Sequence, residues 1–376
     1  MAILVLLVLG AGTAGAWGHS TPPTPTVLAT VPLVATVVAN STTVFAQGVT
    51  NCSDIWAIST SGNVSLYATV PQAMSICEEG ALALAPYSIS VPYNPGNVSN
   101  LPRDAEWGHG GGGHGGHGGR GGCGCRSNET LYDALDGVLY EITDGGTNVS
   151  TVATFPGVPD LTSENMGLTY DQVGWFNNDL IVTSSAGGMI WLVNSSGNVT
   201  LFAQLHTYIG GPAVAPGWFG SYGGDLLVAA KHLNAIVALN SSGNASVVAN
   251  WTTPNAVGFQ SGGGHGWGGW DQDGCGSGSC SFGPNHDVLF VANYSSGAVE
   301  GFPESDVQSY AGQGFIAGGL NAGIGTFTSG GTTSMFASQT QRLSDLAFID
   351  CFQCYAHCGG GHHHIGHCHD GWGGDR

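Results

Sequence analysis

Three glycine-rich segments, residues 105–126, 262–281 and 351–376, contain most of the histidines and cysteines of this chain. Imidazole nitrogens and thiolate sulfurs are the usual ligands of zinc and copper, and glycine lets a backbone wrap around an ion without strain. The pattern therefore predicts binding of copper, zinc or nickel. The candidate ligands are His109, His114, His117, His265, His357, His362, His363, His364, His367 and His369.

The histidines have a second interpretation, as parts of flexible and solvated Gly–His linkers. A purification tag is disfavoured, because the histidines of the tail are interrupted and are followed by further Gly/Trp sequence. Covalent haem is not expected, because Tyr355 follows the Cys351-x-x-Cys354 pair where haem attachment needs a histidine. No nucleotide-binding fingerprint is present either.

The N-terminus predicts export. Residues 1–16 form a short apolar run that ends in Ala14-Gly15-Ala16, which resembles a signal-peptidase site. The run has no basic residue before it, so a retained apolar N-terminal segment is the alternative. No later apolar run has the length of a membrane span. We therefore expect a secreted or cell-surface protein with no integral membrane span in the mature chain.

N-x-S/T triplets support export to a glycosylating compartment, although a chain this rich in Ser, Thr and Asn also forms such triplets by chance. The candidate glycosylation sites are Asn40, Asn51, Asn63, Asn97, Asn128, Asn148, Asn194, Asn198, Asn240, Asn244, Asn250 and Asn293.

Ten cysteines in an exported chain favour disulfide bonds, with thiolate ligation of a metal as the alternative. Cys52 and Cys77 bracket one predicted hairpin, so we expect them to bond to each other. The pairing of the others is not determined by the sequence. They are Cys123, Cys125, Cys275, Cys280, Cys351, Cys354, Cys358 and Cys368.

The charge balance excludes two classes of partner. Six basic residues stand against 25 acidic ones, which gives a formal net charge of -19. Neither nucleic acid nor an anionic membrane surface is an expected partner, because there is no basic patch to neutralise phosphates. Glycans and further copies of the chain are the expected partners.

The elements that carry these segments are repeated β-hairpins. Each consists of an alternating apolar run, a Ser/Asn/Gly turn and a second alternating run, which is typical of two half-buried strands. The clear copies are residues 54–70, 138–155, 189–205 and 235–250, and weaker ones are 294–302, 327–337 and 43–47. Two further strands are predicted before the best copies, at 167–171 and 179–184, 214–219 and 225–230, and 256–260 and 287–293.

Four antiparallel strands per repeat cannot bury both faces of their own sheet, but radial packing of several repeats can. The repeat resembles those of NHL, SMP-30 and YVTN-type β-propellers across residues 26–350. We predict an all-β chain with a single β-propeller of about six, alternatively seven, four-stranded blades and Gly/His/Cys-rich loop inserts. A β-solenoid or sandwich is the alternative fold.

The strand order predicts where the inserts lie. Residues 343–350 are expected to form an innermost strand, whose blade the N-terminal strands at 26–47 complete. The first insert is expected to follow an innermost strand that ends near Ser88, and the second insert and the tail also follow innermost strands. Equivalent loops leave a propeller on the same side, so all three should lie on one rim.

Catalytic motifs are absent, and no catalytic residue is assigned. The acidic residues at strand ends, Asp160, Asp171, Asp225, Asp287 and Asp345, are ordinary turn and capping residues. The resemblance to SMP-30 implies a divalent metal held in the central channel by Glu, Asn and Asp. Glu164 and Asn165 are the nearest match, and the other ligands cannot be assigned.

The sequence favours a non-enzymatic role. We expect an extracellular structural or surface-assembly glycoprotein, a subunit of a surface layer, fibre or matrix, cross-linked by disulfides and metal ions. The alternatives are an extracellular protein that binds divalent copper, zinc or nickel, and a lactonase-like propeller enzyme. Fold alone does not decide among them.

Overall fold

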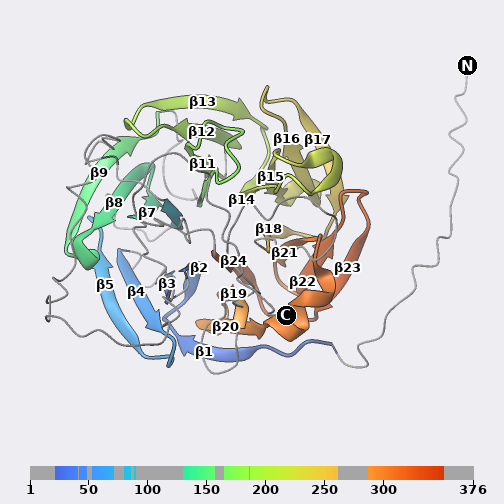
Figure 1. Ribbon diagram of the computed structural model, residues 1–376, viewed down its shortest axis with the longest axis horizontal. Helices are drawn as coiled ribbons and strands as arrows, with labels where there is room; N and C mark the ends of the chain where they lie inside the picture. The colour runs from blue at the N-terminus through green and yellow to red at the C-terminus, as the bar shows by residue number, and fades with distance from the viewer. Residues whose placement is uncertain are drawn as a thin grey trace, which may run out of the picture.

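The computed structural model describes residues 22–40, 42–48, 53–71, 80–85, 89, 130–156, 165–185, 187–260 and 287–350. The chain is all-β, as predicted, and its strands form antiparallel sheets around a common axis, which is the arrangement of a β-propeller (Figure 1). Each blade has four strands, counted here from the innermost outward. No helix in these ranges is long and apolar enough to cross a membrane.

Four blades are formed by consecutive strands. The first has β2 (Val34–Asn40), β3 (Thr43–Gly48), β4 (Asp54–Ser59) and β5 (Val64–Thr69). The second has β6 (Ala81–Ala85), β7 (Thr130–Leu135), β8 (Val138–Thr143) and β9 (Asn148–Thr154). The third has β10 (Met166–Tyr170), β11 (Leu180–Ser184), β12 (Met189–Val193) and β13 (Val199–Gln204). The fourth has β14 (Ile209–Val214), β15 (Leu226–Ala230), β16 (Ala235–Leu239) and β17 (Ala245–Asn250).

The remaining strands are interleaved in sequence. One blade has β18 (Pro254–Phe259), β21 (Gly314–Gly318), β22 (Ile324–Phe327) and β23 (Thr333–Ala337). The other has β24 (Leu343–Asp350), β19 (Asp287–Asn293), β20 (Ala298–Pro303) and β1 (Thr26–Thr30). The one-turn helix α1 (Glu304–Val307) and the 3-10 helix η5 (Gln308–Tyr310) connect β20 to β21. The other 3-10 helices are η2 (Asp144–Gly146), η3 (Gly220–Tyr222) and η4 (Lys231–Leu233).

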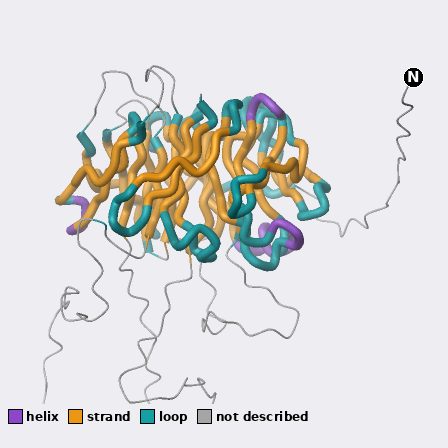
Figure 2. The backbone as a smooth tube through the Cα atoms, turned by 90° about the horizontal axis from the view of Figure 1, so that it is seen from above, coloured by secondary structure: helices purple, strands orange, loops and turns teal. Residues whose placement is uncertain are grey.

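The innermost strands close the ring. β2, β6, β10, β14, β18 and β24 contact one another in a cycle. β14 and β18 pair in parallel at Gly211 and Ala256, and β2 pairs in parallel with β24 at Ala39 and Ile349. Seen from the side, the strands cross the thickness of a flat disc (Figure 2). The innermost strands therefore end on the same rim, which we call the insert rim.

The repeated hairpins form as the sequence predicts. In the turns of β4–β5, β12–β13 and β16–β17, Gly62, Gly197 and Gly243 have φ values of 80°, 76° and 78°. This left-handed conformation suits glycine, which has no Cβ to collide with the backbone. The outer strand of each hairpin also has a one-residue bulge, as between Ile55 and Trp56 in the pairing of β4 with β5.

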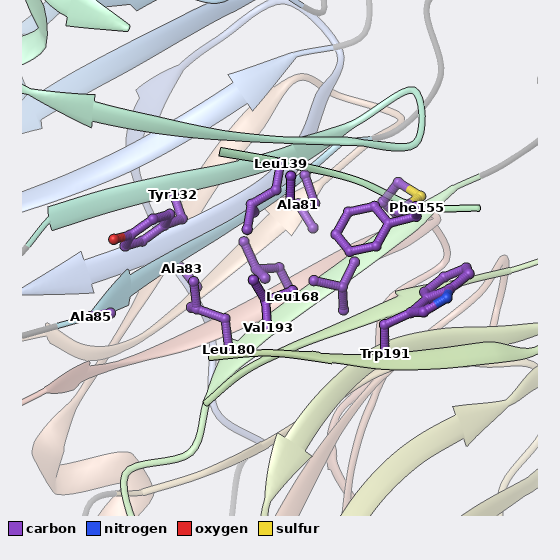
Figure 3. Packing of buried hydrophobic residues seen from close by; sticks show 14 residues of the cluster. Ala81, Ala83, Ala85, Tyr132, Leu139, Phe155, Leu168, Leu180, Trp191 and Val193 are labelled. Atoms are coloured by element: carbon purple, nitrogen blue, oxygen red, sulfur yellow. The ribbon is translucent and has the colours of Figure 1, made fainter. Parts of the chain in front are cut away.

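Apolar side chains between neighbouring blades hold the ring together. Tyr132 and Leu139 of the second blade pack against Leu168, Leu180 and Trp191 of the third (Figure 3). The ring of Trp191 lies 5.1 Å from that of Phe155 and is 1% exposed. Burial of such faces is the main stabilising contribution, as radial packing requires.

Four predictions about strand partners are wrong. Residues 256–260 and 287–293 are not neighbours in one blade, because β18 pairs with β21 and β19 pairs with β24. The run at 43–47 is the second strand of its blade rather than a hairpin copy. The hairpin at 294–302 joins the second and third strands of its blade, and β14 ends at Val214, where the predicted strand 214–219 begins.

The predicted completion of the last blade by N-terminal strands is correct for β1 alone. β1 pairs with β20, and Val31 donates its backbone N–H to Gly297 O at 2.7 Å. β2 and β3, which the prediction also placed there, belong to the next blade.

Candidate functional site

The attachment points of the three inserts lie on the insert rim. β6 ends at Ala85, and Ser88, near which its end was expected, lies outside the described residues; β18 ends at Phe259 and β24 ends at Asp350. The second insert and the tail follow β18 and β24 within two residues, whereas residues 86–104 separate β6 from the first insert. Because the innermost strands run in the same direction, their ends lie on this rim around the axis; β18 is next to β24, and β2 lies between β24 and β6. The histidine and cysteine candidates themselves, including Cys52 and Cys77, lie outside the described residues.

The predicted glycosylation sites differ in exposure. Asn63, Asn148, Asn198, Asn244 and Asn250 are exposed, and Asn194 and Asn240 are half-buried. The first four begin or directly precede the outermost strands β5, β9, β13 and β17, at the ends of those strands that lie on the insert rim. Asn51, Asn97 and Asn128 lie outside the described residues.

Six of the predicted glycosylation sites make side-chain hydrogen bonds within the fold. Asn63 Nδ2 donates to Ser61 Oγ at 2.9 Å, and Asn148 Nδ2 donates to Thr143 Oγ1 at 3.0 Å. Asn194 Oδ1 accepts the backbone N–H of Ser196 and Asn198, and Asn240 does the same in its own turn. Asn40 Oδ1 accepts the N–H of Thr42 and Thr43 and is 7% exposed. Asn293 is 1% exposed and donates its Nδ2 to Glu300 Oε1 at 2.8 Å, so the folded chain does not present this nitrogen for glycosylation.

The outermost strands carry a belt of exposed apolar side chains. Its members are between 51% and 58% exposed and occupy the same position, two residues before a buried or half-buried Ala, in five of the blades. They are Val27, Leu66, Leu201, Val247 and Met335. The equivalent residue of β9 is Thr151. Each of these strands ends the strand order of its blade, so one of its edges has no partner strand within the described chain.

A polar network joins the innermost strands near the axis. Thr36 Oγ1 of β2 donates to Asp345 Oδ2 of β24 at 2.7 Å, and Val37 N donates to the same oxygen at 3.2 Å. Leu82 N of β6 donates to Thr36 Oγ1 at 3.3 Å. This network links three consecutive innermost strands, so Asp345 and Thr36 hold the ring closed at its junction.

The lactonase-type ligand set is not assembled within the described ranges. Asn165 donates its backbone N–H to Ser185 Oγ at 2.9 Å, and Glu164 lies outside these ranges. No group of three or more His, Cys, Asp or Glu residues in the described part of the chain could hold a metal ion.

Asp133 is a buried acid that sequence reasoning missed. It is fully buried in the second blade, where Gln47 Nε2 of the first blade donates to its Oδ2 at 2.8 Å. Burial raises the pKa of Asp133 to about 8, Asp136 adds repulsion, and the Gln47 hydrogen bond opposes both. The available signal was an acid inside an apolar strand (TLYDAL), where the matching residues of other blades are Ala46, Val182 and Val228.

Two further buried acids organise local structure. Glu141 Oε1 accepts the Tyr132 hydroxyl at 2.7 Å and the backbone N–H of Ile89. Asp171 accepts four backbone N–H groups of the loop that follows it, from Val173, Gly174, Phe176 and Asn178. Nearby, burial and then repulsion by Asp171 raise the pKa of Asp179 to about 6.

No family model and no curated protein matches the chain. Among solved structures, it is 12% identical to regucalcin, a calcium-binding protein from Agrobacterium tumefaciens, with a TM-score of 0.47 and coverage of 88% of this chain and 83% of that one. The nidogen/laminin complex gives 12% identity, a TM-score of 0.47 and coverage of 85% and 86%. Virginiamycin B lyase from Staphylococcus aureus gives 13% identity, a TM-score of 0.41 and coverage of 81% of this chain and 69% of that one.

The chain resembles these propeller proteins in its fold, as its repeats predict. The strand order described above carries that resemblance, and the low identities do not bear on activity.

Proposed function

We propose that this chain is an extracellular structural or surface-assembly glycoprotein that associates with further copies of itself. The observation that carries the proposal is the composition of the outermost strands. β1, β5, β9, β13, β17 and β23 contain no Asp, Glu, Lys or Arg. Natural proteins protect open strand edges with charges, above all lysine. These edges have no such protection.

The exposed apolar belt supports the same conclusion. Single exposed apolar residues are ordinary on a protein surface. Here they recur at one position of the edge strands of five blades, so each of these blades can present the same apolar contact to a second copy. Repeated identical edges also allow association in more than one direction, which is what a layer, fibre or matrix requires.

The ring geometry fits such a subunit. We infer that the propeller has six blades, which is supported by the closed cycle of contacts among its six innermost strands. The exposed Asn63, Asn148, Asn198 and Asn244 place candidate glycans around the insert rim. Disulfide bonds and metal ions in the inserts would add cross-links on that rim.

The test is assembly of the exported, glycosylated protein, followed by sedimentation velocity and negative-stain micrographs. We expect ordered assemblies of the wild type, and at least a tenfold higher concentration for assembly when Leu66, Leu201 and Val247 are replaced by Lys. The matched control places Lys at the exposed turn residues Ser61, Ser195 and Ser241 of the same hairpins. Wild-type protein that stays monomeric, or two lysine variants that assemble equally well, would contradict the proposal.

Metal binding is the second candidate function, because the three histidine- and cysteine-rich inserts start from the same rim. Because the inserts start on one rim, ligands from different inserts could bind the same ion. The expected result is stoichiometric copper, zinc or nickel by elemental analysis, reduced when residues 351–376 are deleted. Metal content that is zero, or unchanged by this deletion, would argue against it.

A further inference from the structure

Two loops on the insert rim expose tryptophan through the same local sequence. Residues 171–179 (DQVGWFNND) connect β10 to β11, and residues 215–225 (APGWFGSYGGD) connect β14 to β15. Both contain Gly-Trp-Phe followed by an acid. In each loop the Phe is buried, whereas Trp175 is 55% and Trp218 is 43% exposed. The repeat therefore places one indole on the surface of two adjacent blades.

Both loops are held in a defined conformation. The Asp171 carboxylate accepts four backbone N–H groups of the first loop. In the second loop, Ala215 N donates to Asp225 O and Gly224 N donates to Ala215 O, both at 2.8 Å. Phe219 anchors this loop among Phe259 and Phe327, with ring centroids 4.8 and 5.4 Å away. The exposed indoles are thus carried by rigid loops, which reduces the entropy lost on binding.

Both tryptophans are close to the second loop: Trp218 is part of it, and Trp175 packs on it. A Cβ atom on Gly224 would lie 2.4 Å from Cδ2 of Trp175, so the Trp175 ring lies directly on the backbone of the second loop. Trp218 lies on the same loop, and its ring centroid is 6.2 Å from that of Phe259 at the end of β18. Any substitution at Gly224 would displace Trp175, which explains why glycine stands there.

The exposed side chains beside the indoles are uncharged and mostly polar, and the half-buried Asp225 ends the second loop. The exposed side chains of the two loops, apart from the tryptophans, are Gln172, Val173, Asn177, Asn178 and Ser221. Amides and hydroxyls can both donate and accept hydrogen bonds, but they do not select a charged ligand. A binding partner of this surface should present apolar faces and hydroxyl groups together.

We propose that Trp175 and Trp218 form a binding site for a neutral oligosaccharide. The C–H groups on one face of a pyranose ring are apolar and weakly positive, which suits the negative face of an indole. The hydroxyls at the sugar edge are matched by the amides and the serine around it. A charged peptide finds no opposite charge among the exposed side chains of these loops.

The proposal is tested by titrating the purified full-length protein with cellohexaose, chitohexaose or mannohexaose. Binding is followed by calorimetry and by indole fluorescence. We expect at least one of these sugars to bind, and the affinity to fall at least tenfold in both Trp175→Ala and Trp218→Ala, with partial retention in Trp175→Phe. The matched control is Leu233→Ala, which removes another exposed apolar side chain, 56% exposed, in η4 between β15 and β16. This connection lies on the opposite rim.

Thermal melting of each variant shows whether a loss of binding reflects a loss of folding. Binding to none of the three sugars would overturn the proposal, as would equal loss in the Leu233 variant. Binding of phosphatidylcholine vesicles without sugar binding would assign the tryptophans to a lipid surface instead. Sugar binding does not require self-association, so this result and the assembly test are independent.

Discussion

Replacing Asp133 by Asn should make the protein less sensitive to rising pH. Asp133 is fully buried, and the pKa of its carboxyl is raised from 3.8 to about 8, first by burial and then by Asp136. Between these values the folded protein holds a proton on Asp133 that the unfolded chain has released. The contribution of Asp133 to the free energy of unfolding of the wild type is therefore fully present below pH 4 and is lost progressively as the pH rises to 8.

The size of the effect follows from the pKa difference. One ionisable group contributes about 1.4 kcal/mol of unfolding free energy for each pH unit in this window. From pH 4 to 8 the difference between Asp133→Asn and the wild type should therefore grow by about 5 kcal/mol, and it should stop growing above pH 8. Asn has the shape of the protonated acid and can still accept the Gln47 hydrogen bond, so the two proteins should be equally stable near pH 4.

The assay is urea unfolding followed by indole fluorescence at pH 4.5, 6, 7.5 and 9. Asp144→Asn, which removes an exposed carboxyl from the same blade, controls for the loss of one charge. Two parallel stability curves for the wild type and Asp133→Asn would mean that Asp133 is ionised in the folded protein. That result would refute the reasoning, because it would require a compensating positive charge near this carboxyl.

One substitution and one truncation test local features of the ring. Asp171→Ala removes the acceptor of four backbone N–H groups, so we expect a loss of about 2–4 kcal/mol and faster amide exchange at 173–178; amides that stay protected would contradict this. Deleting residues 1–31 exposes the edge of β20, so we expect a melting temperature several degrees lower than after deletion of residues 1–21. Equal melting temperatures would mean that the pairing of β1 with β20 does not stabilise the last blade.

Local structure was largely predictable from the sequence because the signals for each hairpin lie within its own residues. The alternation in β12 and β13 indicates which residues face the core, and Gly197 fixes the turn between them. The position of β1 was also encoded, since Val27-Leu28-Ala29 matches Leu66-Tyr67-Ala68 of β5. This match is difficult to recognise in the sequence, because β1 is a single strand of five residues and is not part of a hairpin that can be compared with the others.

The buried acids and the exposed tryptophans were harder to predict. A carboxyl in an apolar run looks the same whether it faces solvent or a neighbouring blade, and only the packing of Gln47 on Asp133 distinguishes them. For the Gly-Trp-Phe loops, the sequence does not show which aromatic residue is buried; in the second loop it is Phe219 and not Trp218. Both questions depend on side-chain packing between blades, which alternation within one strand does not determine.

The exchange of strands between the last two blades follows from what surrounds β24. β24 pairs with β19 and with β2, which both come from earlier in the chain. Once β19 and β20 pair with β24, β18 is left to pair with β21. Residues 261–286 then connect β18 to the neighbouring blade, and α1 with η5 connect β20 back.

We expect the exchange of strands between the last two blades to make closure of the propeller ring cooperative. Neither of the two interleaved blades is formed by one continuous segment, and the outermost strand of the last blade, β1, comes from the other end of the described chain. The last blade therefore requires β1, β19, β20 and β24 together, with pairs distant in sequence such as Thr26 with Gly301, and Thr36 of the first blade bonds Asp345 across the junction. Such contacts form late in folding because the loop they close is long. We therefore expect the four continuous blades to form before the two interleaved ones, an order that pulsed hydrogen exchange during refolding would measure.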